Sequence, residues 1–255
     1  MLVAAAVCPH PPVLIPEAMG AAGLTAVPAD PGADGLLAAL RAECAEAVTG
    51  LLDAGADLLI AVGGGAETAE HAASAAGTLR GLGVPFSTGP GEPVLPLSLT
   101  VASWLLRLQP AGCPVILQAV AQDAAPGDCL RLGGSLASRA ARVALLVLAD
   151  GTARKATGVP GAADPAAEQY DAELAAALAD GDAARLARLE PARDSELLAT
   201  GRAPLQVLAG ASQHPMRGRL TFGAAPLDVT YLVASWTLRP DHDRRAAAPA
   251  RQGER

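Results

Sequence analysis

Aromatic residues are nearly absent from this sequence of 255 residues, which holds two tryptophans, two tyrosines and two phenylalanines. Positive charge is also scarce, because 19 lysines and arginines face 26 aspartates and glutamates, for a formal charge of −7. A nucleic-acid surface needs a basic stripe and usually stacking rings. The composition therefore predicts that nucleic acid is not a partner.

Long apolar runs are lacking as well. Uninterrupted runs such as Val143 to Ala149 are far shorter than the roughly 20 residues that a membrane-spanning helix needs. The first residues carry no basic segment typical of a secretory signal, and their apolar stretch meets Pro9 within a few residues. We therefore expect no membrane partner and a cytoplasmic location.

Paired cysteines are missing too. Cys8, Cys44, Cys113 and Cys129 lie far apart, and no C-x-x-C pair occurs. This spacing predicts neither a zinc knuckle nor a disulfide scaffold, and it favours buried thiols.

What the first half does contain is an alternation of short apolar runs with helix-like segments. Strands are predicted over residues 2–7, 56–62, 114–121 and 142–150, and helices over residues 34–55, 66–82, 97–108 and 126–141. Alternating strands and helices predict an α/β fold: a layered sandwich with a central, mostly parallel mixed sheet flanked by helices, in a single domain.

The second half begins with a clear helix start at Asp164-Pro165, and Asp182 and Asp194 are further N-cap candidates. A short buried helix is predicted over 203–211, followed by two antiparallel strands over 219–222 and 229–236. The sequence thus predicts one domain over residues 1–239 and a polar, disordered tail over 240–255.

Gly63, Gly64 and Gly65 follow the second predicted strand, where backbone N–H groups at a helix start can hold a phosphate. The dinucleotide fingerprint is incomplete, because Thr68 stands where a glycine or alanine is required, and no P-loop lysine is present. The favoured interpretation is a tight strand-to-helix turn that opens a site. Nor is there a Gly-x-Ser-x-Gly elbow, which disfavours a serine hydrolase.

Three histidines are candidates for chemistry. His71 lies in a helix-like stretch with acidic neighbours, which favours a solvated face, and His214 lies in a loop before the last strands. His10 follows the first predicted strand, at the edge where parallel sheets bind ligands, and the prolines around it restrict its backbone. His10 is therefore the strongest single candidate.

Three motifs resemble those of a known family: "VCPHPPVLIPE" from Val7, "VPFSTGPGEPVLPLSLTVASWLL" from Val84, and "GRAPLQVLAGAS" from Gly201. In this order and pattern of elements they resemble the LigB-like class III extradiol ring-cleavage dioxygenases, including their Memo-like relatives. The resemblance covers about residues 1 to 238. It implies an α/β fold, and an Fe(II) ion held by two histidines and a third ligand beside a catalytic histidine.

By this resemblance, His10 falls on the first histidine ligand. The second ligand would stand where this chain has Gly63 to Gly65, the catalytic histidine where it has Asp150 and Thr152, and the late ligand where it has Gly201 and Arg202. One imidazole cannot hold Fe(II), and an arginine in the same pocket would repel a cation. The resemblance thus favours the fold and disfavours the reaction, with Fe(II) as a cofactor by resemblance only.

The leading prediction is a dioxygenase-like protein that has lost ring cleavage and binds a small molecule in the old pocket. The predicted lining is His10, Glu17, Gly63, Gly64, Gly65, Asp150, Thr152, Arg202 and Gln206. Convergence of Arg202, His10 and the glycine N–H groups would favour a small anion. Glu17 and Asp150 also have structural interpretations, as a helix cap and as an Asx-turn residue.

Two other function classes stay open. One is an active metal-dependent oxygenase with relocated ligands, using His10 with Asp150, His71 or His214. The other is an interaction protein with a vestigial pocket, which an exposed apolar patch around Trp104 or Trp236 would reveal, although core packing suits both tryptophans better. A second copy of the chain, in a homo-oligomer, is a further candidate partner.

Overall fold

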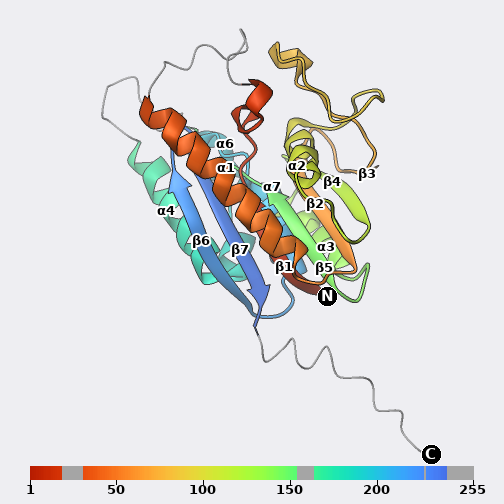
Figure 1. Cartoon of the computed structure of the whole chain (residues 1–255). Helices are drawn as coiled ribbons and strands as arrows, with labels where there is room; N and C mark the ends of the chain where they lie inside the picture. Colours follow the sequence, from red (N-terminus) through yellow and green to blue (C-terminus); the bar gives the residue numbers. More distant parts are fainter. Residues whose placement is uncertain (19–30, 154–163, 227, 240–255) are drawn as a thin grey trace, which may run out of the picture.

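The centre of the molecule is a sheet of seven strands in the order β3-β4-β2-β5-β1-β7-β6 (Figure 1). The computed structural model describes residues 1–18, 31–153, 164–226 and 228–239. Four strands run parallel: β1 (Leu2–Cys8), β2 (Leu58–Gly65), β4 (Val115–Ala121) and β5 (Val143–Leu148). Three pair antiparallel to a neighbour: β3 (Ala69–Ala72), β6 (Met216–Ala224) and β7 (Tyr231–Leu238).

Helices cover both faces of this sheet. The α-helices are α1 (Pro31–Leu52), α2 (Leu97–Arg107), α3 (Pro126–Ala137), α4 (Pro165–Asp180), α5 (Ala183–Ala187), α6 (Pro191–Leu197) and α7 (Arg202–Ala211). Three short 3-10 helices are η1 (Pro12–Leu14), η2 (Pro16–Ala18) and η3 (Arg80–Leu82). Side chains alternate along each strand, so Leu59 and Ala61 join the core under α1 and α2, while Ile60 and Val62 join the core under α3, α4 and α7. The predicted layered α/β sandwich is confirmed.

Several local predictions are also confirmed. The side chain of Asp164 accepts a hydrogen bond from the Ala166 N–H at 2.9 Å, and that of Asp182 accepts one from the Arg185 N–H at 3.0 Å, as N-caps do. Cys8, Cys44 and Cys129 are buried free thiols and Cys113 is half-buried. Trp236 belongs to the core, with 1% of its surface exposed, and Trp104, within α2, is partly buried against the core. The predicted tail over 240–255 lies outside the described residues.

The helix predicted over 66–82 is wrong. Residues 69–72 of this segment instead form the edge strand β3, in which His71 pairs with Leu117 of β4. Side-chain contacts tie the segment to β4, because Gln118 Nε2 donates to the Ala69 carbonyl at 3.1 Å and Thr68 Oγ1 accepts from the Ala121 N–H at 3.0 Å. Pairing along the sheet has overridden the helix propensity of its alanines.

The turn predicted at the triple glycine is wrong as well, because β2 runs through Gly65 and pairs with β4 to its end. The glycines are needed for close packing instead. A Cβ atom on Gly63 would lie 2.4 Å from Ser98 Oγ, at the start of α2. Ser98 Oγ also donates to the Gly64 carbonyl at 2.7 Å, so α2 begins directly against the strand.

Asp194 is the third correction, since it lies inside α6 and does not cap a helix. Its carboxylate is buried and contacts two side chains from other elements, which are described below. None of the helices in the described ranges combines the length and the apolarity needed to cross a membrane.

Candidate functional site

The four parallel strands end at one edge of the sheet, which we call the carboxyl edge. β1 and β5 are neighbours in register up to Cys8 and Leu148, so the segments that follow them also meet there. The backbone N–H of His10 donates to Asp150 Oδ1 at 2.8 Å, and His10 Nδ1 lies 3.4 Å from the same oxygen. Two of the predicted site residues are therefore brought together.

The imidazole of His10 is almost enclosed, with 8% of the residue exposed. Its Nδ1 atom is buried and has no hydrogen-bond partner within the described part of the chain. Asp150 also lies near Tyr231 on β7, whose pKa is raised mainly by burial and further by the Asp150 charge. A buried polar atom without a partner is costly, which marks this pair as a place where a bound group would be stabilising.

The other predicted residue of the β5 loop, Thr152, faces inward and is fully buried. Its N–H and its hydroxyl donate to the two carboxylate oxygens of Asp171, at 3.0 and 2.8 Å, and Thr230 Oγ1 donates to the same carboxylate. The Gly151 N–H donates to the Thr230 carbonyl at 2.8 Å. Asp171 of α4 thus fixes the loop that carries Asp150.

The remaining predicted residues on the first two strands are dispersed. Glu17 is exposed on η2. Gly63 and Gly65 are covered by the segment that starts α2, through Ser98 and Pro96. Gly64 instead faces Gln122 and the Thr200 carbonyl, 3.4 and 3.7 Å from the position of its missing Cβ.

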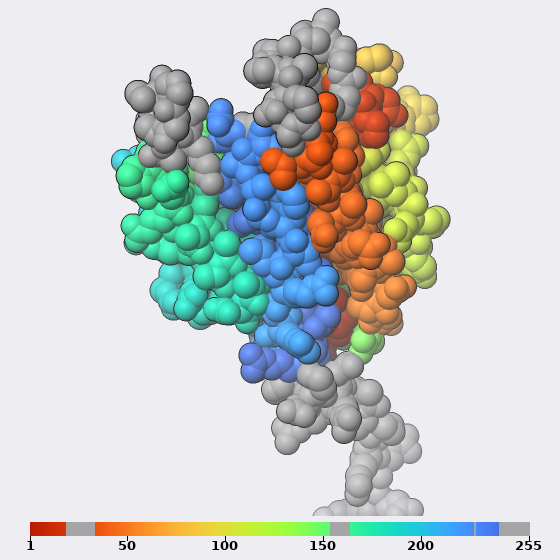
Figure 2. Space-filling model, turned by 60° about the vertical axis from the view of Figure 1, so that its left-hand side comes forward, coloured from red at the N-terminus to blue at the C-terminus, as the bar shows by residue number. Residues whose placement is uncertain are grey.

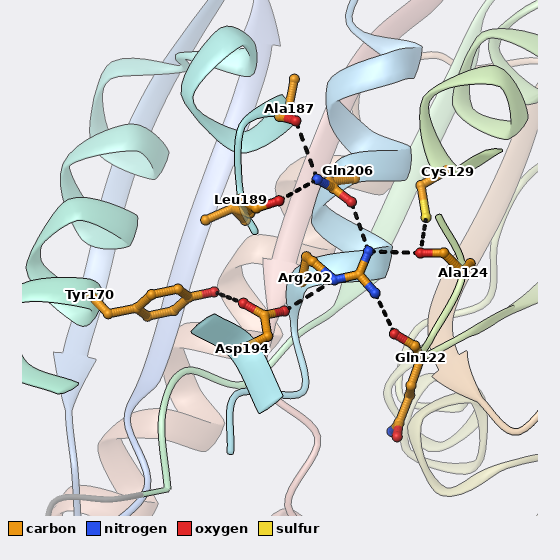
Figure 3. Close-up of polar contacts among 9 residues, drawn as sticks. All are labelled: Gln122, Ala124, Cys129, Tyr170, Ala187, Leu189, Asp194, Arg202 and Gln206. Carbon is orange, nitrogen blue, oxygen red and sulfur yellow. Dashed lines mark hydrogen bonds and ion pairs between the residues drawn. The ribbon is translucent and has the colours of Figure 1, made fainter. Parts of the chain in front are cut away.

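Arg202 and Gln206 form a separate buried network with Asp194 (Figure 3). Arg202 Nε lies 3.3 Å from Asp194 Oδ2, and Nη1 donates to Gln206 Oε1 and to the Ala124 carbonyl, both at 2.9 Å. Nη2 donates to the Gln122 carbonyl. Gln206 Nε2 in turn donates to the carbonyls of Ala187 and Leu189, at 3.2 and 2.8 Å. The network ties α6, α7 and the segments after β4 and α5 together.

Asp194 is the acidic centre of this network. Tyr170 donates its hydroxyl proton to Asp194 Oδ1 at 2.6 Å, and the guanidinium of Arg193 lies 5.3 Å above the Tyr170 ring. Burial raises the pKa of Asp194 to about 6, against the opposing effects of the Tyr170 hydrogen bond and the Arg202 charge. The pKa of Tyr170 is raised by its own burial and by the Asp194 charge.

A cavity of about 440 Å³ opens beside this network, between the segment after β4 and the α6–α7 connection. Its wall is formed by Gln122, Asp123, Pro191, Asp194, Ser195, Leu198, Ala199, Thr200, Arg202 and Ala203. Leu198 is 57% exposed and adopts a left-handed conformation, with φ of 53°. Leu198 is the C-cap residue that ends α6, a position where helices often adopt this left-handed conformation.

The donor set does not fit the iron site of the resembled family. His10 and Asp150 supply two donors, and no group of three or more His, Cys, Asp or Glu side chains suited to a metal ion occurs in residues 1–18, 31–153, 164–226 and 228–239. His71 lies on β3, which is four strands away from β1 in the sheet. Because neighbouring strands are ~4.8 Å apart, this separates His71 from the β1 strand by about 19 Å. His214 precedes β6, and β6 starts at the end of the sheet that is opposite to the carboxyl edge.

Sequence reasoning missed Asp171, Tyr170 and the role of Asp194. The spacing of Asp171 to Ala167, Leu174 and Leu178 places its carboxylate on the buried face of α4, which is the signal that could have identified it. Gln122 and Thr200 carried no comparable signal, because only the fold brings the β4 and α6 segments together.

Comparison with known proteins adds a likeness of structure. No family model matches the chain, and no curated protein matches it. A similar solved structure is the crystal structure of an uncharacterized protein from Escherichia coli K12, with 12% sequence identity and a TM-score of 0.48, over 92% of this chain and 99% of that chain.

Proposed function

We propose that this chain is an extradiol-dioxygenase-like protein that has lost Fe(II)-dependent ring cleavage and binds a small molecule at the carboxyl edge. The donor set carries this proposal. By the resemblance, a metal would be held where His10 and Asp150 meet, and the described residues bring no third donor to this pair. A facial iron site needs three protein ligands, so this pair would leave Fe(II) weakly held.

The cavity beside Arg202 is the proposed binding place. Its volume of about 440 Å³ lies within the range of small-molecule sites, roughly 300 to 1,000 Å³. It lies next to Gly64 at the end of β2, through Gln122 and Thr200. The exposed side chain of Leu198 supplies an apolar wall, and Ser195 and Thr200 supply hydroxyl groups.

The charges of the cavity bear on the class of ligand. The sequence predicted a small anion held by Arg202, but the guanidinium already contacts Asp194, Gln206 and two carbonyl oxygens. Asp123 adds a carboxylate to the same wall. An uncharged ligand with hydrogen-bond donors, such as a phenol or a polyol, is therefore better supported than an anion.

Iron content tests the loss of ring cleavage. The full chain is reconstituted anaerobically with Fe(II), freed of unbound metal and analysed for iron beside a His10→Ala control. We expect far less than one iron per chain, and the same trace in the variant. Near-stoichiometric iron that disappears in His10→Ala would contradict the proposal and favour the oxygenase with relocated ligands.

Thermal-shift screening tests the binding of a small molecule, with matched sets of phenols, polyols, carboxylates and phosphate esters. A true ligand should raise the Tm of the native chain and of Ala176→Trp, a control on the exposed side of α4. It should not raise that of Ser195→Trp, whose indole would fill the cavity. A shift that survives in Ser195→Trp would place the ligand elsewhere, and a shift from anions alone would restore the ligand class predicted from the sequence.

A further inference from the structure

A second hollow lies away from the carboxyl-edge cavity, between α1 and the outer strand β6. It has a volume of about 450 Å³, and we call it the α1–β6 groove. Its wall is formed by Glu43, Glu46, Ala47, Gly50, Arg217, Gly218, Arg219, Thr221, Ser235 and Thr237. Figure 2 shows this side of the molecule, where β6 runs between α1 and α4.

The groove exists because α1 covers only part of the last two strands. On the α1 side of β7, Tyr231 and Val233 are buried in the core, whereas Ser235 and Thr237, further along the strand, are not. The opposite residues on β6 are Arg219 and Arg217, which pair with Ser235 and Thr237 across the strands. The sequence itself therefore changes from apolar to polar where the helix no longer covers the sheet.

Charges of opposite sign line the two sides of the groove. Glu43 and Glu46 belong to α1, and Arg217 and Arg219 belong to β6. Glu46 and both arginines are exposed, and Glu43 is half-buried. In the part of the chain that the structure describes, none of these four side chains makes an ion pair or a hydrogen bond. Other exposed charges on the surface do form ion pairs, namely Asp128–Arg131, Glu70–Arg139 and Glu173–Arg193.

We propose that the α1–β6 groove is the contact surface for a second copy of this chain in a two-fold symmetric dimer. A two-fold axis brings the same surface of both copies together, so a surface with separate acidic and basic sides can be complementary to itself. Glu43 and Glu46 of each copy then face Arg217 and Arg219 of the other copy. The same set of ion pairs therefore forms twice, once on each side of the two-fold axis.

The neighbouring surface allows this approach. The exposed ridge of α1 beside the groove carries Ala38, Ala42 and Gly50, whose small side chains let a second backbone come close. β6 is an outer strand of the sheet, and proteins protect such strands from uncontrolled pairing with charged side chains or with a specific partner. Arg217 and Arg219 would serve both purposes, since they exclude wrong partners and attract the right one.

Reversal of the charges tests the dimer directly. In Glu43→Arg/Glu46→Arg all four groove charges are positive, and in Arg217→Glu/Arg219→Glu all four are negative. The masses of the native chain, of each variant and of their equimolar mixture are measured by analytical ultracentrifugation at low salt. We expect the native chain to be a dimer, each variant to show half that mass, and the mixture to return to the dimer mass.

A matched control reverses an exposed ion pair on the opposite side of the sheet, with Asp128→Arg/Arg131→Glu on α3. It should remain a dimer, and circular dichroism should show that every variant is folded. High salt should dissociate the native dimer, because exposed ion pairs are screened. A monomeric native chain, variants that stay dimeric, or a mixture that stays monomeric would each overturn the proposal. The ligand proposal at the carboxyl edge would be unaffected.

Discussion

Two polar groups lie close to the carboxyl edge and differ in how completely their atoms are bonded. In the Arg202 network, the guanidinium has four polar contacts, and Asp194 is shared between Arg202 and Tyr170. In the His10–Asp150 pair, one oxygen serves the backbone of His10 while the buried Nδ1 has no hydrogen-bond partner among the described residues. The polar contacts of the Arg202 network are thus all made within the described residues, whereas the His10–Asp150 pair leaves one buried nitrogen without a hydrogen bond.

The difference separates a structural role from a functional one. Buried charges are tolerated when hydrogen bonds satisfy them, and such a network then holds particular elements in one arrangement. An unsatisfied buried atom costs about 1–3 kcal/mol, so its retention calls for an explanation such as a bound group. Arg202 carries the stronger charge, but its polar atoms are already bonded within the chain. The histidine pair does not line the cavity beside Arg202, and its buried Nδ1 offers a separate contact for a bound group.

Replacement of Arg202 should have the largest effect on stability. Arg202→Met leaves Asp194 and two carbonyl oxygens buried without their partner, and loss of one member of a buried ion pair costs about 3–5 kcal/mol. Urea unfolding followed by circular dichroism would measure the loss. The double variant Asp194→Asn/Arg202→Met should recover part of it, because the uncompensated charge is gone. A loss below about 1 kcal/mol would show that the network is not structural.

The next effect is a pH dependence that comes from Asp194. Its pKa is about 6 in the folded chain and 3.8 as the ordinary value, so the folded state binds the proton more tightly. The resulting stabilisation is fully present below pH 4 and is lost as the pH rises through 6. An increase of this size in the pKa corresponds to about 3 kcal/mol.

The Asp194→Asn variant isolates this contribution, because it keeps the shape and removes the titration. We expect the difference in unfolding free energy between the native chain and Asp194→Asn to change between pH 4 and pH 7, with the native chain relatively less stable at pH 7. A difference that is constant over this range would mean that the Arg202 ion pair keeps Asp194 ionised throughout.

Substitution of Gly63 should have a smaller effect, through packing alone. Gly63→Ala places a methyl group 2.4 Å from Ser98 Oγ, and overpacking of this kind costs about 1–3 kcal/mol. Adding Ser98→Gly should restore much of the stability by removing the clash, although it also deletes the hydrogen bond to the Gly64 carbonyl. If the losses of stability from Gly63→Ala and Ser98→Gly simply added in the double variant, the contact with Ser98 would not be the reason why position 63 is a glycine.

How well the sequence predicted each part depends on the range of the interactions involved. The parallel strands and α1, α2 and α7 were predicted because their apolar spacing is local and strong. β3 was not, since its alanines favour a helix and only pairing with β4 makes it a strand. The glycine run was misread for a related reason: Ser98, 35 residues after Gly63, determines why a side chain is excluded there.

The candidate site shows the same division. His10 and Asp150 could be placed together because both follow parallel strands, and the carboxyl ends of such strands share one edge. The sequence predicted that Arg202 lines the same pocket, but the direction of its side chain depends on Asp194, which the sequence pattern suggested as a helix cap. Contacts between distant segments decide whether a charged side chain faces a ligand or its own protein, and spacing along the chain does not reveal them.

The smallest effect on stability is expected for His10→Ala, and it tests the comparison most directly. The substitution loses the packing of a mostly buried ring. It also removes a buried nitrogen that has no hydrogen-bond partner among the described residues, and these contributions oppose each other. The backbone bond from residue 10 to Asp150 stays in place, because it uses the N–H group. We expect the unfolding free energy to change by less than about 1 kcal/mol, within the range of ordinary substitutions, while a ligand that contacts the imidazole loses affinity. If His10→Ala proved as destabilising as Arg202→Met, both groups would be structural and His10 would lose its support as a contact for a bound group.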